Sequence, residues 1–215
     1  MTYLQLINDV LVRLREAQVS TNSETTYSAL IGKFVNDAKR QIEDAYAWNV
    51  LGQTVTITTT PGTYIYSMTG AGQKFQVMDA LNTTANVGMQ NISFVQMNRF
   101  QNLVPAISGI PEYYAFDGVD GNGDTKVVLY ARPDNVYTLP FALTVPQAPL
   151  ASDSTLVKVP DVLVVQNAYA RALVERGEDG GLSSSEAYQL YRGMLADYIA
   201  LEGTRFPEQQ EFVAI

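Results

Sequence analysis

The first fifty residues carry two runs of apolar residues at helical spacing. In the first run the apolar positions are three or four residues apart: Leu4, Ile7, Leu11 and Leu14. Thr2 and Gln5 stand three apart just before and within this run, as in a capping box, and together these features predict a helix over residues 3–17.

The second run predicts an amphipathic helix between Tyr27 and Ala45. Its apolar face is expected to be buried, and its other face carries charged and polar residues that we assign to solvent: Lys33, Asn36, Asp37, Lys39, Arg40, Glu43 and Asp44. Trp48, the only tryptophan, follows this helix. We interpret it as a structural anchor that packs the helix against the next segment, because buried aromatic rings mostly stabilise cores.

After Gly52 the pattern changes to alternation of apolar and polar residues interrupted by turn residues. Residues 53–60 and 63–67 flank Pro61 and Gly62, which predicts a hairpin. Further strands are predicted at residues 75–81, 111–116, 126–132 and 137–145, with a short helix at residues 92–100 that Ser93 begins. Pro140 cannot donate a hydrogen bond to a neighbouring strand, so we expect the last strand to lie at a sheet edge or to end early.

Helical spacing returns near Pro160 and continues until Gly177. Ser183 and Glu186 form a second capping-box pattern, and the apolar stripe that follows runs to about Gly203. A short Gly/Ser loop separates the two predicted helices, which indicates an antiparallel helix hairpin.

The order of elements predicts an α+β fold in which the N-terminal and C-terminal helix pairs form a four-helix bundle with an inserted antiparallel β lobe. We expect the boundaries near Gly52 and Ala151. The predicted parts are an N-terminal helix pair (1–51), a β-rich lobe (52–150), a C-terminal helix hairpin (151–205) and an extended C-terminal tail (206–215).

Composition limits the chemistry that the chain can perform. The 215 residues include 47% hydrophobic residues, which is typical of a folded globular protein, but neither cysteine nor histidine. A disulfide, a Cys or His zinc site and a histidine general base are therefore excluded. We expect no catalytic site, no metal and no cofactor. No apolar stretch approaches the roughly 20 residues that cross a bilayer, so no membrane association is expected.

The net charge of −8 argues against binding to nucleic acid, which requires a basic surface. Most of the excess of acidic residues lies in the last third of the chain.

The segment 117–125 is the most distinctive candidate for a binding loop. Asp117 precedes Asp120, Asn122 and Asp124, and the last three occupy positions 1, 3 and 5 of a calcium-loop pattern. Position 6 is Thr125 rather than glycine and position 12 is Ala131 rather than glutamate, so the pattern fails there. The alternative is a loop of Gly, Asn and Asp that joins two strands of a hairpin.

Two other classes of function remain open. Asp79, Glu112, Asp117 and Asp134 could supply a carboxylate pair for glycoside hydrolysis, although exposed acids at turns and strand ends are the simpler interpretation. A carbohydrate-binding or tail-fibre-type β module would use exposed tyrosines for stacking, and the candidates are Tyr113, Tyr114, Tyr130 and Tyr137. Tyrosines are also ordinary strand residues.

The tail after residue 205 contains Phe206, Phe212, Val213 and Ile215. It is either a frayed end or an extended segment that docks on a partner's groove or sheet edge, because exposed apolar ends need an explanation.

Several segments resemble the head-to-tail adaptor (connector) proteins of tailed bacteriophages, including the tail tubular protein A group of short-tailed phages. The resemblance lies in residues 4–11, in residues 34–42 with Trp48 after them, in residues 109–118, and in residues 128–134 followed by 137–139. The loop at 117–125 and the tail sequence depart from the family pattern.

This resemblance implies a structural virion protein of the tail or neck, made in the host cytoplasm. Such a protein would form a ring of about twelve copies (a dodecamer) on the portal, continue the DNA channel used in ejection without binding DNA specifically, and support the nozzle or fibre proteins. It also implies that the tail docks on the portal through Phe206, Phe212, Val213 and Ile215. We further expect the β lobe, including the hairpin with Asp117, Asp120, Asn122 and Asp124, to face the tail side or the outer rim and to meet the nozzle or fibre proteins.

Overall fold

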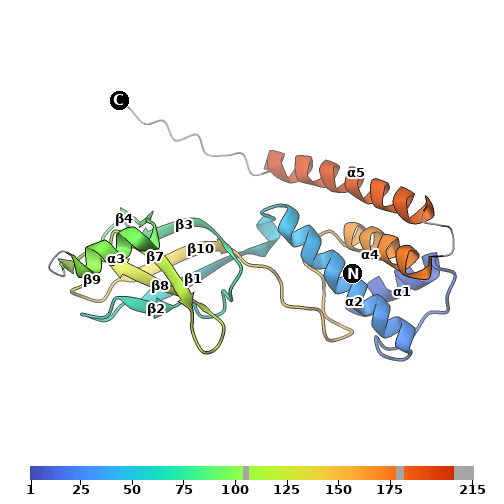
Figure 1. The fold of residues 1–215 in the computed structure, drawn as a ribbon, viewed down its shortest axis with the longest axis horizontal. Helices are drawn as coiled ribbons and strands as arrows, with labels where there is room; N and C mark the ends of the chain where they lie inside the picture. The colour runs from blue at the N-terminus through green and yellow to red at the C-terminus, as the bar shows by residue number, and fades with distance from the viewer. Residues whose placement is uncertain (104–106, 178–181, 206–215) are drawn as a thin grey trace. The chain divides into compact units, whose positions relative to one another are not determined.

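The computed structural model describes residues 1–103, 107–177 and 182–205. The chain divides into two compact units, Met1–Leu51 with Pro146–Ile215 and Gly52–Val145. We call the first the helical unit and the second the β unit (Figure 1).

The helical unit is built around one central helix. Its elements are α1 (Tyr3–Arg13), α2 (Thr26–Ala45), the short 3-10 helix η1 (Asn49–Leu51), α4 (Asp161–Arg176) and α5 (Leu182–Arg205). The central helix is α4, which packs against α1, α2 and α5. Its buried apolar residues, together with those of α1 and α2, form one core, to which α5 contributes the buried side chain of Tyr191.

Local sequence determines where α1 begins and ends. The capping box is confirmed: the Gln5 backbone N–H donates to Thr2 Oγ1 at 3.3 Å, and the Thr2 N–H donates to Gln5 Oε1 at 2.9 Å. The helix ends at Arg13, earlier than the predicted residue 17, because Arg15 adopts a left-handed conformation (φ 60°). The Glu16 N–H then donates to the Leu11 carbonyl at 2.9 Å, which closes a Schellman-type end.

A buried ion pair on α2 holds the chain where it returns from the β unit. Lys39 Nζ lies 3.0 and 3.1 Å from the two carboxylate oxygens of Glu43, and the two side chains are only 3% and 1% exposed. Lys39 also donates to the Gln147 carbonyl at 2.6 Å, and Glu43 accepts from the Gln147 N–H at 3.2 Å. Both charges therefore have partners on the returning backbone.

Asn36, one turn earlier on α2, binds the same segment. Its Oδ1 accepts from the Leu150 N–H at 2.7 Å, and its Nδ2 donates to the Leu150 carbonyl at 3.0 Å. The assignment of Asn36, Lys39 and Glu43 to a solvent face was wrong. They form a polar strip to which residues 147–150 attach, because spacing alone does not distinguish solvent from a backbone partner.

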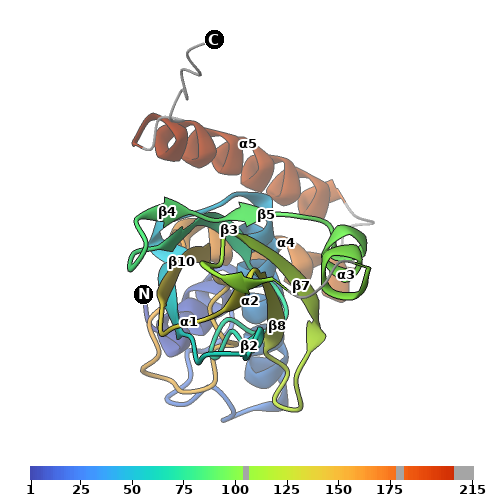
Figure 2. The ribbon, with the colours of Figure 1, turned by 90° about the vertical axis from the view of Figure 1, so that its left-hand side faces the viewer.

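The β unit consists of two four-stranded sheets and one small sheet. The first has the order β1 (Gly52–Thr58), β10 (Thr138–Thr144), β3 (Gln76–Asn82) and β4 (Val87–Gly88); the second has the order β2 (Ile65–Ser67), β8 (Thr125–Tyr130), β7 (Tyr113–Val119) and β5 (Gln90–Asn91). The small sheet pairs β6 (Ser108–Gly109) with β9 (Arg132–Pro133). Figure 2 shows the helix α3 (Phe94–Asn102) beside β7, and α3 also contacts β8.

The two larger sheets share a core. Tyr114 of β7 meets Phe141 of β10 edge to face, with ring centroids 5.3 Å apart. Leu129, Leu139 and Leu143 complete the centre of this cluster. Alternate residues of β10 are buried in this core, as expected where one face of a sheet is buried. In β8 three consecutive residues are buried, because Val128 packs in a separate cluster with Met97 of α3.

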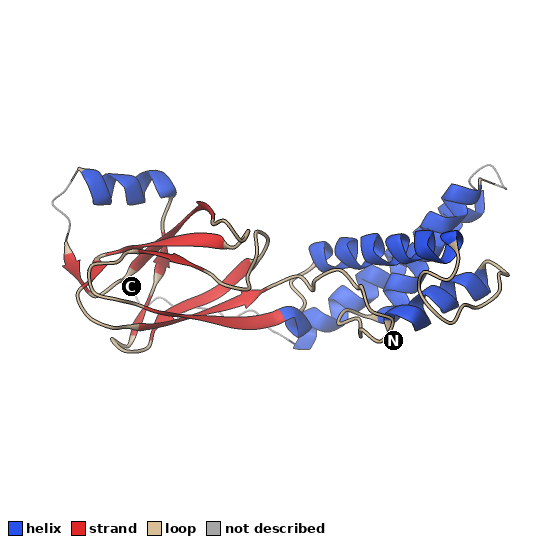
Figure 3. Ribbon diagram, turned by 90° about the horizontal axis from the view of Figure 1, so that it is seen from below, coloured by secondary structure: helices blue, strands red, loops and turns tan. Residues whose placement is uncertain are grey.

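The predicted four-helix bundle with an inserted antiparallel lobe is wrong. The described residues form an α+β fold with five α-helices and ten strands in three sheets, so the β part is large and has its own core (Figure 3). It also contains α3 and two parallel strand pairs, β5 with β7 and β6 with β9.

The predicted hairpin across Pro61 and Gly62 is also wrong. Strand β1 pairs with β10 and β2 pairs with β8, so the two strands belong to different sheets. The Thr59 N–H donates to the Tyr137 carbonyl and the Gly62 N–H to the Pro133 carbonyl, at 2.9 and 2.8 Å. The turn is therefore bound to distant segments and connects the sheets.

Pro140 does not place β10 at an edge, because β10 lies between β1 and β3. Thr138 faces β3, since its carbonyl accepts from the Thr83 N–H, and alternation along β10 turns the Pro140 nitrogen toward β3 as well. The register between β3 and β10 is irregular beside Ala142. Strand β10 thus accommodates the missing N–H group of Pro140 on the side that faces β3, where its pairing is less regular.

Replacing Lys39 by Met should lower the unfolding free energy of the helical unit by about 3–5 kcal/mol, because Glu43 would stay buried without its cation. The double variant K39M/E43M should be less destabilised than K39M. Its unfolding free energy should be about 1–3 kcal/mol below that of wild type, because the backbone groups of Gln147 lose their partners. Fluorescence of Trp48 during denaturation measures this unit. Lys33→Met, at an exposed position of α2, is the control, and a double variant as unstable as the sum of the single ones would contradict the interpretation.

Burial raises the pKa of the Glu43 carboxyl above 4.5, while the hydrogen bond and charge of Lys39 act in the opposite direction. The folded state therefore binds the proton more tightly than the unfolded state. Glu43 contributes most to stability below its unfolded pKa, and this contribution is lost as the pH rises through its raised pKa. The unfolding free energy of wild type relative to E43Q should fall across that window, and a rise would contradict the assignment.

Candidate functional site

The loop between β7 and β8 is closed by the side chain of Asp120. Its Oδ1 accepts from the N–H groups of Asn122 and Asp124 at 2.8 and 3.0 Å. The Asp120 N–H donates to the Asp124 carbonyl at 2.8 Å, and Gly123 has a positive φ of 88°. These bonds form a tight turn for which Asp, Asn and Gly are suited.

Asp124 joins this loop to a second one. Its Oδ1 accepts from the N–H groups of Gly70 and Gly72 at 3.2 and 3.0 Å. A hydrogen bond from the Ser67 side chain, followed by those from the loop backbone, lowers the pKa of the Asp120 carboxyl below its ordinary value of 3.8. Both carboxylates thus accept hydrogen bonds from the protein itself.

These contacts favour the hairpin interpretation over a calcium site. Strands β7 and β8 pair antiparallel on either side of the loop, which confirms the predicted hairpin. Asp117 lies across from Lys126, with 3.9 Å between the charged atoms. Within the ranges that the structure describes, no cluster of three acidic residues could hold a metal ion.

The four candidate tyrosines do not form one exposed platform. Tyr114 and Tyr137 are buried in the core of the β unit. Tyr113 and Tyr130 are half-buried and pack with Phe100 of α3, with centroid distances of 6.3 and 4.8 Å. The Tyr137 hydroxyl donates to Asp134 at 2.6 Å, which gives that candidate acid a structural partner.

Trp48 is among the residues that line a groove of the helical unit. It is 2% exposed, its Nε1 donates to the Ile42 carbonyl at 2.7 Å, and its ring meets Tyr46 edge to face. The groove has a volume of about 590 Å³. Its lining comes from the segment after α2, from the residues just before α4 and from the last two turns of α5, and includes Val50, Lys158, Pro160, Tyr198 and Leu201.

The helix α5 exposes more apolar surface than a helix of a monomer core requires. Of its 24 residues, only Ser184, Ala187 and Tyr191 are buried. Large apolar side chains are exposed along its length: Leu182 (74%), Tyr188 (40%), Leu190 (57%) and Leu201 (62%). An apolar surface of this kind is typical of a contact with another protein.

The four residues predicted to dock on the portal, Phe206, Phe212, Val213 and Ile215, lie outside the described residues. The segment that carries them follows Arg205, which lines the groove beside Trp48. Asp117, Asp120, Asn122 and Asp124 lie together in the β unit, at and beside the loop between β7 and β8.

Comparison with known proteins identifies the relatives of this chain. The family model described as SU10 adaptor protein matches residues 1–210. The chain belongs to the SU10 adaptor protein family. None of the curated proteins compared with this sequence matches it.

Membership of this family makes the chain a structural component of a phage virion and implies association with portal and tail proteins. The resemblance to phage adaptor proteins is confirmed at this level, whereas its narrower form, the tail tubular protein A group, is not. None of the described helices is long and apolar enough to span a membrane.

Sequence reasoning did not identify the groove beside Trp48 or the exposed face of α5. The groove depends on three segments that are far apart in the chain, so no local pattern indicates it. The exposed face of α5 had no separate signal either: Leu190 belongs to the apolar stripe that predicts this helix, yet its side chain is 57% exposed. A stripe of apolar residues does not indicate whether the core of the same chain or another chain covers it.

Replacing Asp124 by Ala should lower the unfolding free energy of the β unit by about 1–3 kcal/mol, because the Gly70 and Gly72 N–H groups lose their acceptor. The near-ultraviolet circular dichroism of the tyrosines would follow this transition. Asp117→Ala should cost less than about 1 kcal/mol, since its ion pair is exposed. Added calcium should leave the wild-type melting temperature unchanged, and a clear increase would show that the loop binds the ion.

Proposed function

We propose that this adaptor forms a ring of about twelve copies between the portal and the tail of a phage, where it continues the DNA channel and supports tail components. The observation that carries the proposal is the match of the adaptor family over residues 1–210. Ring formation, portal binding and a role in DNA ejection go beyond that match.

The exposed side of α5 supports lateral contacts between copies. A ring requires surfaces beyond those that fill the core of one copy, and α5 offers Leu182, Leu190 and Leu201 for this purpose. Each of these side chains is more than half exposed, so their burial between copies would stabilise a ring by the hydrophobic effect.

The C-terminal tail is proposed to dock on the portal. Phe206, Phe212, Val213 and Ile215 are its apolar anchors, and two acidic residues, Glu208 and Glu211, lie among them. Apolar anchors separated by polar residues suit an extended segment that binds a groove or a sheet edge.

The β unit is proposed to meet the nozzle or fibre proteins through the loop between β7 and β8. This loop is preorganised by Asp120 and Asp124, so it would lose little conformational freedom on binding. The net charge of −8 would allow DNA to pass through a channel of such subunits without adhering.

The proposal is tested by mixing the purified protein with the portal encoded by the same phage and imaging the product by negative-stain electron microscopy. A second ring stacked on the portal is expected. Truncation after Gly203 should abolish it, and so should a full-length variant with Phe212, Val213 and Ile215 changed to Ser. A variant with Glu208 and Glu211 changed to Gln is the matched control, and portal binding by the truncated chain would exclude the tail as the docking element.

Lateral contacts through α5 are tested with L190D/L201D. This variant should keep the melting temperature of wild type within a few degrees, because both side chains are exposed in the monomer. It should also reduce the fraction of portals that carry a complete ring. Q189D/A196D places the same two charges at other exposed positions of α5, and equal loss of rings in that control would show a general charge effect.

A further inference from the structure

Strand β1 presents an open edge that the described part of the chain does not use. It pairs with β10 over all seven of its residues without a register shift. The Thr59 N–H donates to the Tyr137 carbonyl, so alternation directs the N–H and C=O groups of Thr54, Thr56 and Thr58 away from β10. No hydrogen bond from residues 1–103, 107–177 or 182–205 reaches these groups.

This edge lacks the usual protection against strand addition. Exposed edge strands are commonly protected by charged side chains, proline, a bulge or a short length. Residues 52–58 include no charged residue and no proline, and their pairing with β10 is regular. An edge of this kind is suited to accept another strand.

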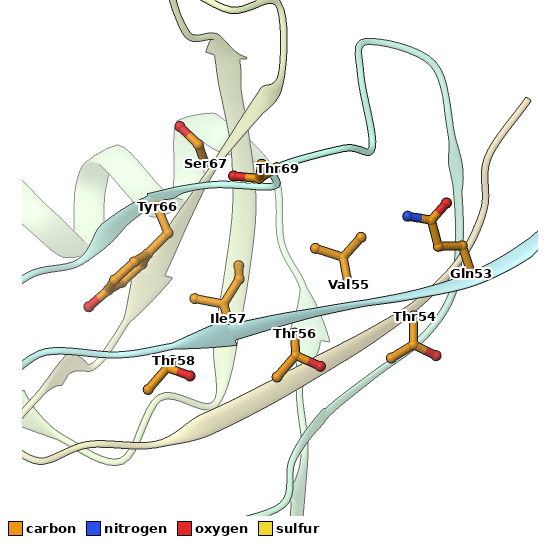
Figure 4. A pocket seen from close by; sticks show the side chains of 9 residues that line it. All are labelled: Gln53, Thr54, Val55, Thr56, Ile57, Thr58, Tyr66, Ser67 and Thr69. Carbon is orange, nitrogen blue, oxygen red and sulfur yellow. The ribbon is translucent and has the colours of Figure 1, made fainter. Parts of the chain in front are cut away.

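A cleft runs beside the same edge. It lies between β1 and the edge strand β2 of the other sheet and has a volume of about 380 Å³. Figure 4 shows the side chains of Val55 and Ile57 on one side of β1 and those of Thr54, Thr56 and Thr58 on the opposite side. An added strand would therefore direct alternate side chains into the cleft.

The sequence of β1 is self-complementary in the antiparallel direction. Residues 54–58 read Thr-Val-Thr-Ile-Thr and are symmetric in side-chain type about Thr56. When two copies pair about this residue, Thr56 faces Thr56, Thr54 faces Thr58 and Val55 faces Ile57. Pairs of threonines and of β-branched apolar residues are favourable across strands.

The β1 edge adds no charge repulsion between two copies. Two chains with a net charge of −8 repel each other, and an uncharged strand is a place where they can meet without opposing like charges. Antiparallel pairing also places the partner's Gly52 opposite Thr60, so the two chains enter the shared sheet from opposite ends.

We propose that the free protein forms a two-fold symmetric dimer in which the β1 edges of two copies pair antiparallel about Thr56. The groups of Thr54, Thr56 and Thr58 then form six hydrogen bonds with their counterparts, while Val55 and Ile57 stay in the core of their own β unit. Such an isologous contact closes on two copies, so it cannot build a ring. The proposal is therefore independent of the portal-bound ring and describes the protein before assembly.

Disulfide trapping tests the register directly, because the chain contains no cysteine. In a dimer of T56C the introduced cysteines of the two copies lie opposite each other. Their Cα atoms are roughly 5.5 Å apart, a distance that a disulfide can span. Under mild oxidation T56C should form covalent dimers much faster than T138C. Thr138 is exposed on the same face of the sheet but lies on the inner strand β10. Equal rates for the two variants would overturn the register.

Sedimentation equilibrium then tests the interface without a cross-link. The wild type should dimerise reversibly, and both T56P and T56K should abolish the dimer. T56P removes the outward N–H while leaving the pairing with β10 intact, and T56K sets two positive charges against each other. T138K, the matched control, should dimerise like wild type.

Amide exchange measured by NMR identifies the edge that is involved. In the dimer the Thr54, Thr56 and Thr58 amides should become protected as the concentration rises, whereas those of Val55 and Ile57 should be protected throughout. A protein that stays monomeric up to about 1 mM overturns the proposal. A dimer that survives T56P and T56K, or protection that arises only with the portal or a tail protein, overturns it as well.

Discussion

The contact of Lys39 and Glu43 with Gln147 determines how the chain returns to the helical unit after forming the β unit. Residues 52–145 leave this unit after η1, and the chain must be held again where it comes back. Burying two charged side chains costs free energy because they lose their hydration. Here Lys39 and Glu43 bind each other, and each also forms a hydrogen bond with one backbone group of Gln147. Asn36 continues the attachment to Leu150. This anchored segment leads into α4. It therefore fixes where α4 begins, and α5 packs against α4.

Helices were predicted well from the sequence because their determinants are local. Caps at Thr2 and Ser93 and the apolar spacing of α1 and α2 involve residues within one or two turns. The role of the polar face of α2 could not be obtained in this way. Lys39 and Glu43 have the spacing of a solvent-exposed pair, and only the distant Gln147 shows that they are buried.

Strand positions were predicted, but strand partners were not. Residues 53–60 and 63–67 have the composition and turn of a hairpin, yet each strand finds a better partner far along the chain, β10 for one and β8 for the other. Pairing depends on side chains that meet in a core, such as Tyr114 with Phe141, and these contacts have no local pattern. The β7–β8 hairpin was predictable because Asp120 closes its turn within five residues.

The proposed functions rest on the resemblance to a family and on surfaces that the fold of one chain does not require. In α1 most large apolar residues are buried, so the fold of one chain explains most of its sequence. In α5 most are not, and in β1 an uncharged, regular edge remains open. Neither feature stabilises the monomer, because exposed apolar side chains gain nothing from folding and open edges promote association. Both features are open to other chains: α5 is proposed for neighbours in the ring, and β1 for a second copy before the ring forms. The residues left unexplained by the fold of one chain are therefore the ones that we propose for contacts between chains.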